Sequence, residues 1–289
     1  MRRVLRFLGL TILALPVLLL LALAGGLVWA NSEGGRATIA RLAADAVPGL
    51  AIEGLQGPLP ARIGIARLVL ADADGAWVDV EEARIALDLP ALLRREVRIA
   101  AVTAERVALH RLPPGDGTPP PPPDPDAPLV PSLSELPVSL RLDRLAVERI
   151  ELGAAVIGTD AVLAVEGEAA LDGGALTARL DLRRLDAPAS ARIALDLAPA
   201  TDRLSARIEA AEPPGGLVAT LLGLPERPAA ARLTLDGPAS GARLSLAASL
   251  GDDVTLAAEG EVSAAVDGAA GAALQLRVKA APLLPAGLR

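Results

Sequence analysis

Apolar and polar residues alternate in a long series of short segments between about Ala61 and Val278. The segments Ala191–Leu197 (ARIALDL) and Arg232–Asp236 (RLTLD) are typical. A period of two indicates a β-strand with one apolar face and one wet face. Because the pattern recurs a dozen or so times with almost no helix between, it predicts an all-β fold built on one very long amphipathic sheet.

Breaks in the alternation predict where the strands bend or end. Phase shifts at Ala66-Arg67 and Glu81-Glu82 predict bulges or turns, because a slip of one residue reverses the two faces. Pro90 to Arg95 predicts a brief turn or helical segment. In the second half, turn residues recur every 8–12 residues or so, which favours antiparallel strands joined by hairpins. These turns are Gly173-Gly174, Asp236-Gly237-Pro238 and Gly251-Asp252-Asp253.

Two short helices interrupt the predicted sheet. Arg36 to Val47 carries apolar residues at helical spacing and is ended by Pro48-Gly49, so we expect a short helix capping the open end of the sheet. The alternative, a helix lying on the membrane surface, is poorly supported with only Arg36 and Arg41 as basic residues. Pro213 opens a second helical segment through Leu222.

The N-terminus predicts a single membrane span. Three arginines precede Phe7 to Ser32, a stretch without any charged residue. Phe7 to Ala30 would form a helix of about 36 Å, enough to cross a hydrocarbon layer of about 30 Å. The arginines before the span place the N-terminus in the cytoplasm and all later residues outside it. The alternative is a cleaved signal peptide ending near Val28-Trp29-Ala30.

A proline run divides the rest of the chain. Pro113 to Pro131 contains ten prolines in 19 residues, a density that neither sheet nor helix tolerates. We therefore expect a solvated polyproline II loop between two halves of the sheet. The predicted organisation is an anchor at 1–31, a first sheet segment with its capping helix at 32–112, the Pro-rich loop at 113–131, and a second sheet segment at 132–289.

Composition narrows the function. The net charge of −7 argues against nucleic acid as a partner, and the absence of cysteine excludes disulfides, thiolate catalysis and Cys-ligated zinc. His110 is the sole histidine and is expected to be an exposed structural residue. Asp72-Ala73-Asp74-Gly75 resembles the start of a calcium loop but lacks the later ligands, so a turn is expected. No nucleophile elbow or phosphate-binding glycine signature occurs, and we predict neither an enzyme nor a bound cofactor or metal.

The ordered series of segments resembles the TamB family. The resemblance begins at Gly35-Arg36-Ala37, continues through Val47-Pro48-Gly49-Leu50 and Leu87-Asp88-Leu89-Pro90, and includes Leu222-Gly223-Leu224-Pro225. TamB proteins are the inner-membrane subunits of the translocation and assembly module, in the AsmA-like group. The resemblance implies a β-taco, a long curled sheet whose apolar face lines an open groove. It also implies an outer-membrane partner, TamA, and roles in outer-membrane protein assembly and in phospholipid movement between the two membranes.

The resemblance also implies where the protein is located and what its groove binds. It implies a protein anchored in the bacterial inner membrane with its bulk in the periplasm, with phospholipid acyl chains in the groove. Roughly 14 strands at about 4.8 Å would give only about 67 Å of sheet. Family members are longer, so the chain is read as a truncated TamB without the region that meets TamA. The residues expected to line the groove are aliphatic: Leu140, Leu142, Ile193, Leu195, Leu233 and Leu235.

Two alternatives to lipid transport remain open from the sequence. The groove or a free sheet edge could hold unfolded outer-membrane β-strands, which is the role of a chaperone for β-barrel insertion. Alternatively, the sheet could close on itself as a structural spacer without cargo.

Overall fold

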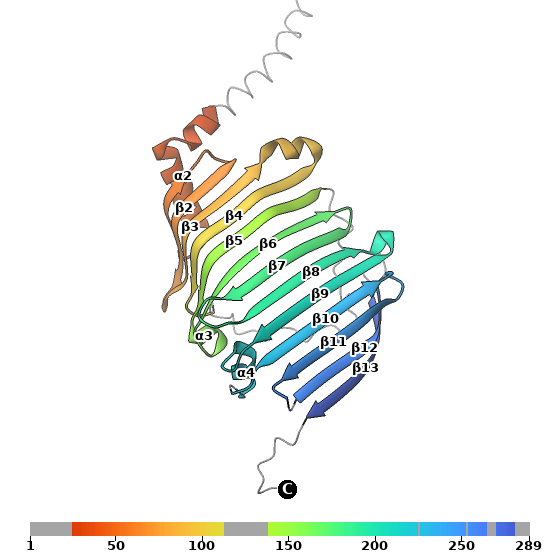
Figure 1. Ribbon diagram of the computed structural model, residues 1–289. Helices are drawn as coiled ribbons and strands as arrows, with labels where there is room; N and C mark the ends of the chain where they lie inside the picture. Colours follow the sequence, from red (N-terminus) through yellow and green to blue (C-terminus); the bar gives the residue numbers. More distant parts are fainter. Residues whose placement is uncertain (1–24, 113–137, 225, 253, 265–269, 281–289) are drawn as a thin grey trace, which may run out of the picture.

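One sheet of thirteen strands makes up most of the computed structural model, which describes residues 25–112, 138–224, 226–252, 254–264 and 270–280 (Figure 1). The strands lie side by side in sequence order, from β1 at one edge to β13 at the other. The predicted all-β class is therefore confirmed for the described part of the chain.

The elements of the first half are α2 (Glu33–Ala46), β1 (Leu50–Gln56), β2 (Arg62–Asp72), β3 (Gly75–Asp88), the 3₁₀ helix η1 (Leu89–Arg94) and β4 (Glu96–Leu109). The elements of the second half are β5 (Ser139–Leu152), α3 (Ala154–Ile157), β6 (Ala161–Asp172), β7 (Ala175–Arg184), β8 (Ser190–Ala198), η3 (Pro199–Thr201), β9 (Arg203–Glu212), α4 (Leu217–Leu221), β10 (Ala229–Gly237), β11 (Ala242–Leu250), β12 (Val254–Ala264) and β13 (Ala270–Ala280). The short helix α3 was not predicted.

The sheet is mixed, and the prediction of a wholly antiparallel sheet is wrong at one place. Strands β4 and β5 pair in parallel, with Glu96 opposite Ser139 and Leu109 opposite Leu152. Every other neighbouring pair is antiparallel. A hairpin reverses the chain, whereas parallel neighbours need a connection of about a dozen residues or more. Residues 110–138, which include the Pro-rich segment, provide that length between β4 and β5.

The predicted phase shifts occur as irregularities in adjacent strands. Glu82 has a φ of 51°, and neither Ala66 nor Glu82 has a partner in the register of β2 and β3. Gly54, with a φ of 64°, lies directly against Ala66 on the neighbouring β1. Such bulges let the apolar side chains return to one face and increase the local twist of the strands.

The predicted turn at Gly173-Gly174 is confirmed and the chain also turns after Gly237, whereas Asp253 of the third predicted turn lies outside the described residues. Gly173 and Gly174 both have positive φ and join β6 to β7 as a two-residue hairpin. Asp72 and Gly75 face each other at the end of the β2–β3 hairpin, where the Asp74 N–H donates to Asp72 Oδ1 at 2.8 Å. The predicted helical turn after Pro90 is η1, which ends at Arg95 in the left-handed region.

Helix α2 begins three residues before the predicted Arg36 and ends at Ala46, one residue before the predicted Val47. Ser32 caps its N-terminus, because its Oγ accepts from the Gly35 N–H at 3.1 Å. The helix lies against β1, the first strand of the sheet (Figure 1).

The predicted anchor lies largely outside the described residues, which begin at residue 25. Within the described ranges, no helix combines the length and apolar character needed to cross a membrane. The Pro-rich segment 113–131 also lies outside the described residues.

Candidate functional site

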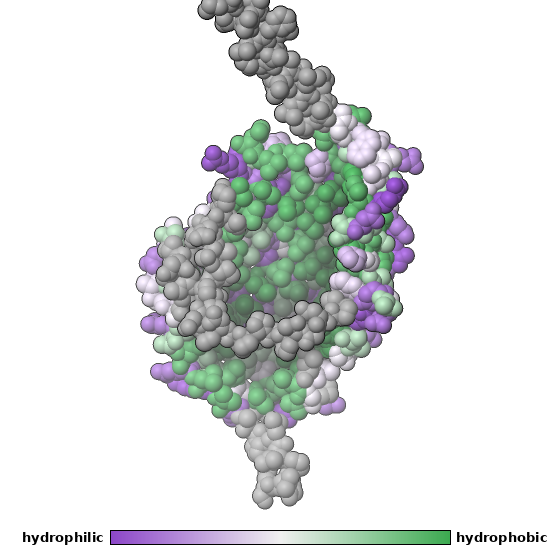
Figure 2. All heavy atoms as spheres, turned by 180° about the vertical axis from the view of Figure 1, so that it is seen from behind, coloured by the Kyte–Doolittle hydropathy of each residue, from purple (hydrophilic) through white to green (hydrophobic). Residues whose placement is uncertain are grey.

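One face of the sheet is apolar across all its strands. Directly opposite residues on neighbouring strands share a face, and the register aligns aliphatic residues in rows. On β8 to β11, one such row consists of Ile193, Ile208, Leu233 and Leu246. Figure 2 views the molecule from the side opposite to that of Figure 1 and shows hydrophobic residues gathered in a hollow and bordered by polar residues.

The six residues predicted to line a groove all belong to this apolar face. Ile193 and Leu195 on β8 lie in adjacent rows of this face, and Leu233 and Leu235 on β10 occupy the same two rows. Leu140 and Leu142 lie on β5, opposite Val97 and Ile99 of β4, three strands away from β8. The register thus places four of the six within two strands of each other, whereas Leu140 and Leu142 lie about 14 Å from β8 at the usual strand spacing.

Most large side chains of this face are only partly covered. The residues that are buried are mainly alanines, and among the larger described hydrophobic residues only Val165, Leu204 and Leu250 are buried. Leu140 is 37% exposed, and Leu142, Ile193, Leu195, Leu233 and Leu235 are partly exposed. No large side chain among the described residues is completely buried. A core in which a second layer covered the sheet would bury such residues almost fully.

Two hollows lie on the apolar face. The smaller, of about 250 Å³, is lined by β4, β5, β6 and β7 and includes Leu140 and Leu142. The larger, of about 380 Å³, lies beside α4 and the ends of β6 to β12 and is lined chiefly by aliphatic side chains. None of Ile193, Leu195, Leu233 and Leu235 lines either of these hollows.

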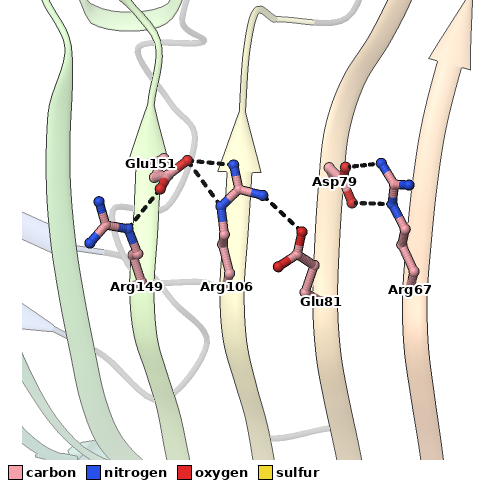
Figure 3. A network of polar contacts seen from close by, with 6 residues as sticks. All are labelled: Arg67, Asp79, Glu81, Arg106, Arg149 and Glu151. Carbon is pink, nitrogen blue, oxygen red and sulfur yellow. Dashed lines mark hydrogen bonds and ion pairs between the residues drawn. The ribbon is translucent and has the colours of Figure 1, made fainter.

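The opposite face carries rows of ion pairs. On β2 to β5, Arg106 contacts Glu81 at 2.9 Å and Glu151 at 2.6 Å, and Arg149 contacts Glu151 at 2.7 Å (Figure 3). Beside them, Arg67 donates to both carboxylate oxygens of Asp79, at 2.6 and 3.2 Å. Hydrogen bonds from Arg106, and then from Arg149, lower the pKa of Glu151 to about 2.

A second row of alternating charges crosses the outer face of β7 to β10. Asp181, Arg192, Glu209 and Arg232 stand directly opposite one another in that order. Arg192 contacts Asp181 at 3.2 Å and Arg232 contacts Glu209 at 3.3 Å. These pairs are exposed and each contributes little to stability, but together they mark this face as the one in contact with water.

The residues considered for catalysis or metal binding do not assemble into a site. His110 is exposed just after β4, and its backbone N–H donates to the Trp77 carbonyl at 3.0 Å. Asp72 forms an ion pair with Arg111 and closes the β2–β3 turn. Within the part of the chain that the structure describes, no group of three or more potential ligands could hold a metal ion.

One polar residue of the apolar face was missed from the sequence. Arg184 follows Leu182 by two positions and pairs with Leu163, so it belongs to the apolar face, not the charged one. Its side chain is only 8% exposed, lines the larger hollow and is paired with Asp186 at 2.5 Å. The signal was present, because the alternation that places Leu180 and Leu182 inside also places residue 184 inside.

The family model described as "TamB, N-terminal domain" matches residues 19–164, which is half of the chain and includes β1 to β5 and the start of β6. No curated protein and no solved structure matches.

Proposed function

The chain belongs to the TamB family, and on this premise we propose that it acts in outer-membrane biogenesis by carrying phospholipid acyl chains along the apolar face of its sheet. In this proposal, the segment Phe7 to Ala30 anchors the protein in the inner membrane and the sheet extends into the periplasm. The chain itself catalyses no reaction and needs no cofactor.

The observation that carries the proposal is an apolar face without a covering layer among the described residues. Its large aliphatic side chains stay partly exposed while alanines supply most of the buried positions. Contiguous exposed apolar surface on this scale is unfavourable in water and is typical of a surface that binds an apolar partner. The charged outer face supports the same orientation, because it can face the aqueous periplasm while the inner face contacts lipid.

The free energy of acyl-chain binding is consistent with movement along the sheet and not with permanent retention. Burial of each acyl CH₂ contributes about 0.8 kcal/mol, so a tail of about fourteen carbons gains about 11 kcal/mol in the ideal case. A bilayer gives a similar gain per CH₂. Because the two gains are nearly equal, a tail can leave the membrane for the sheet, and leave the sheet again, without a deep minimum on either side.

The test places a charge on each face of one strand. Leu195→Asp puts a carboxylate among the aliphatic side chains, whereas Ala194→Asp puts it on the exposed face opposite Arg179. We expect Leu195→Asp to abolish phospholipid transfer between inner- and outer-membrane vesicles, and Ala194→Asp to leave it unchanged. Equal transfer by the two variants would contradict the proposal.

A second candidate is a chaperone that holds unfolded β-barrel strands together with an outer-membrane partner such as TamA. It is favoured by β13, which pairs only with β12 among the described strands and exposes Leu276 and Val278 by 64% and 62%. A photocrosslinker at position 195 separates the candidates. Acyl-chain adducts support the conduit, polypeptide adducts support the chaperone, and a lack of adducts supports a spacer without cargo.

A further inference from the structure

The larger hollow of the apolar face has a cause in the register of the strands. Next to the row of Ile193, Ile208, Leu233 and Leu246 lies a row made of alanine: Ala191, Ala210, Ala231 and Ala248. Four consecutive strands thus present a methyl group where the adjacent row presents a branched chain. The space of about 380 Å³ above them falls within the range of about 300–1,000 Å³ typical of small-molecule pockets.

Helix α4 makes this hollow different from the rest of the apolar face. Val218 and Leu222 at α4 contribute to its wall, together with Leu163, Leu182 and Leu256 of the sheet. The loop before the helix is fixed by Glu212, whose Oε2 accepts from the Val218 N–H at 2.9 Å. The hollow is thereby bounded by the sheet and by α4, whereas the rows of Ile193 and Leu195 lie on the open sheet.

Arg184 is a polar group built into this wall. Its Nε and Nη2 donate to the two carboxylate oxygens of Asp186, at 3.0 and 2.5 Å. Its Nη1 is buried and has no hydrogen-bond partner among the described residues. An unsatisfied donor on a buried cation is unfavourable, so the arrangement favours a ligand that supplies an acceptor oxygen beside an apolar chain.

The charges around Arg184 select the kind of acceptor. Asp186 neutralises the cation, and Glu212 is a second carboxylate that lines the hollow; both residues raise the pKa of Arg184. A ligand that carries a full negative charge would therefore be repelled by the excess of carboxylates around Arg184. A neutral acceptor, such as the carbonyl oxygen of an acyl ester, accepts from Nη1 without that cost.

We propose that the hollow beside α4 is a holding site for one ester-linked acyl chain, whose chain lies over the alanine row and whose ester carbonyl accepts from Arg184 Nη1. The proposal rests on the proposed lipid-carrying function and adds to it a position on the sheet and the residue that recognises the ester. It distinguishes glycerolipids, which carry ester carbonyls, from free fatty acids, which carry a carboxylate. Because Nη1 is buried, the guanidinium must turn toward the hollow to donate to the ligand.

The experiment uses a photocrosslinker at Val218, on the wall of the hollow, and separately at Leu142, in the smaller hollow. The full chain is incubated with vesicles of palmitoyl phosphatidylcholine, and adducts are quantified by mass spectrometry. Two variants alter the site, Arg184→Met by removing the donor and Ala210→Leu by filling the space. Arg192→Met is the matched control, because it removes an ion-paired arginine from the outer face. Thermal unfolding checks that each variant is folded.

We expect Arg184→Met to lower the adduct yield at 218 about tenfold, the loss expected for one hydrogen bond to a charged group. The yield at 142 should not change, and Arg192→Met should match the parent at both positions. Ala210→Leu should also lower the adduct yield at 218, and it provides the test if Arg184→Met does not fold.

Lysophosphatidylcholine should compete for the 218 adduct at lower concentration than palmitate. Unchanged yields at 218 in both variants, or stronger competition by palmitate, would overturn the holding site. Absence of lipid adducts at both 218 and 142 would instead defeat the proposed function itself.

Discussion

Glu151 resolves a repulsion that the parallel pairing of β4 and β5 creates. Glu96 lies opposite Ser139 and Leu109 opposite Leu152, a constant offset of 43 residues (139 − 96 and 152 − 109). This offset places Arg106 directly beside Arg149. Like charges on facing positions are destabilising, and Glu151 lies between them and accepts from both (Figure 3).

Replacement of Glu151 by Gln should therefore destabilise the chain and remove part of its acid sensitivity. The pKa of Glu151 is lowered in the folded state from 4.5 to about 2, first by Arg106 and then by Arg149. Its contribution is thus fully present above pH 4.5 and is lost as the pH falls toward 2. We expect Glu151→Gln to lower the free energy of unfolding at pH 7 by about 1 kcal/mol, because the pair is partly exposed. Urea unfolding at pH 7 and pH 2.5 measures the difference, which should shrink at the lower pH.

Glu148→Gln provides the control for this experiment. Glu148 lies on the same strand, is exposed and forms no ion pair with any described residue. Its replacement should leave the free energy of unfolding within about 0.5 kcal/mol of the parent at both pH values. If the two variants behaved alike, the bridge between Arg106 and Arg149 would have no energetic role.

At the scale of elements, the two adjacent glycines of α2 have different surroundings. A Cβ on Gly34 would meet nothing within 4 Å, whereas a Cβ on Gly35 would lie 1.9 Å from the carbonyl oxygen of Trp29. Neither glycine has a positive φ. Gly35 is therefore needed for close packing of the helix start against the preceding turn, and Gly34 is not.

Gly34→Ala should stabilise α2 by up to about 1 kcal/mol, since alanine favours helix over glycine and has room here. Gly35→Ala should destabilise it by about 1–3 kcal/mol, because the clash is with backbone that cannot rotate away. Hydrogen exchange of the α2 amides reports both changes locally. Equal protection in the two variants would mean that the helix start does not pack against residue 29.

Strands and turns were predictable from the sequence because both have local signals. Two glycines between alternating segments are enough to define the hairpin at Gly173-Gly174, and the shift at Glu81-Glu82 marks a bulge that the structure contains. The parallel pairing of β4 with β5 was not predictable in this way. Alternation within each strand is identical for parallel and antiparallel neighbours, and the choice depends on the connection between them.

The apolar face was predictable, but its hollows were not. Alternation placed Leu140, Leu195 and Leu235 on one face, as the register has them. The larger hollow depends on alanines from four strands falling in one row and on the position of α4, and both are set by pairing over long sequence separations. Arg184 is a different case, because the local alternation from Leu180 and Leu182 places it on the apolar face, although an arginine in a strand is ordinarily assigned to the wet face.

At the scale of the whole molecule, stability comes from strand pairing more than from a deep core. Backbone hydrogen bonds and ion pairs link thirteen strands in one layer, while the buried cluster around Leu204, Ala239 and Ala242 is small. Such a sheet can keep its shape while its apolar face remains available to a partner. A sealed sandwich made from the same residues would bury that face and leave nothing for cargo to contact.

Single-cysteine accessibility separates an open face from a sealed one. The chain contains no cysteine, so each substitution introduces the only thiol. Cysteine at Leu140, Ile193 or Leu233 should react with a small water-soluble maleimide, because these side chains are partly exposed, whereas Leu204→Cys should react at least tenfold more slowly because Leu204 is only 3% exposed. Added phospholipid should protect the first three positions but not Ala194→Cys on the outer face. If, without lipid, the cysteines at 140, 193 and 233 reacted as slowly as the one at 204 and only the cysteine at 194 reacted fast, the sheet would be closed. The protein would then be a spacer.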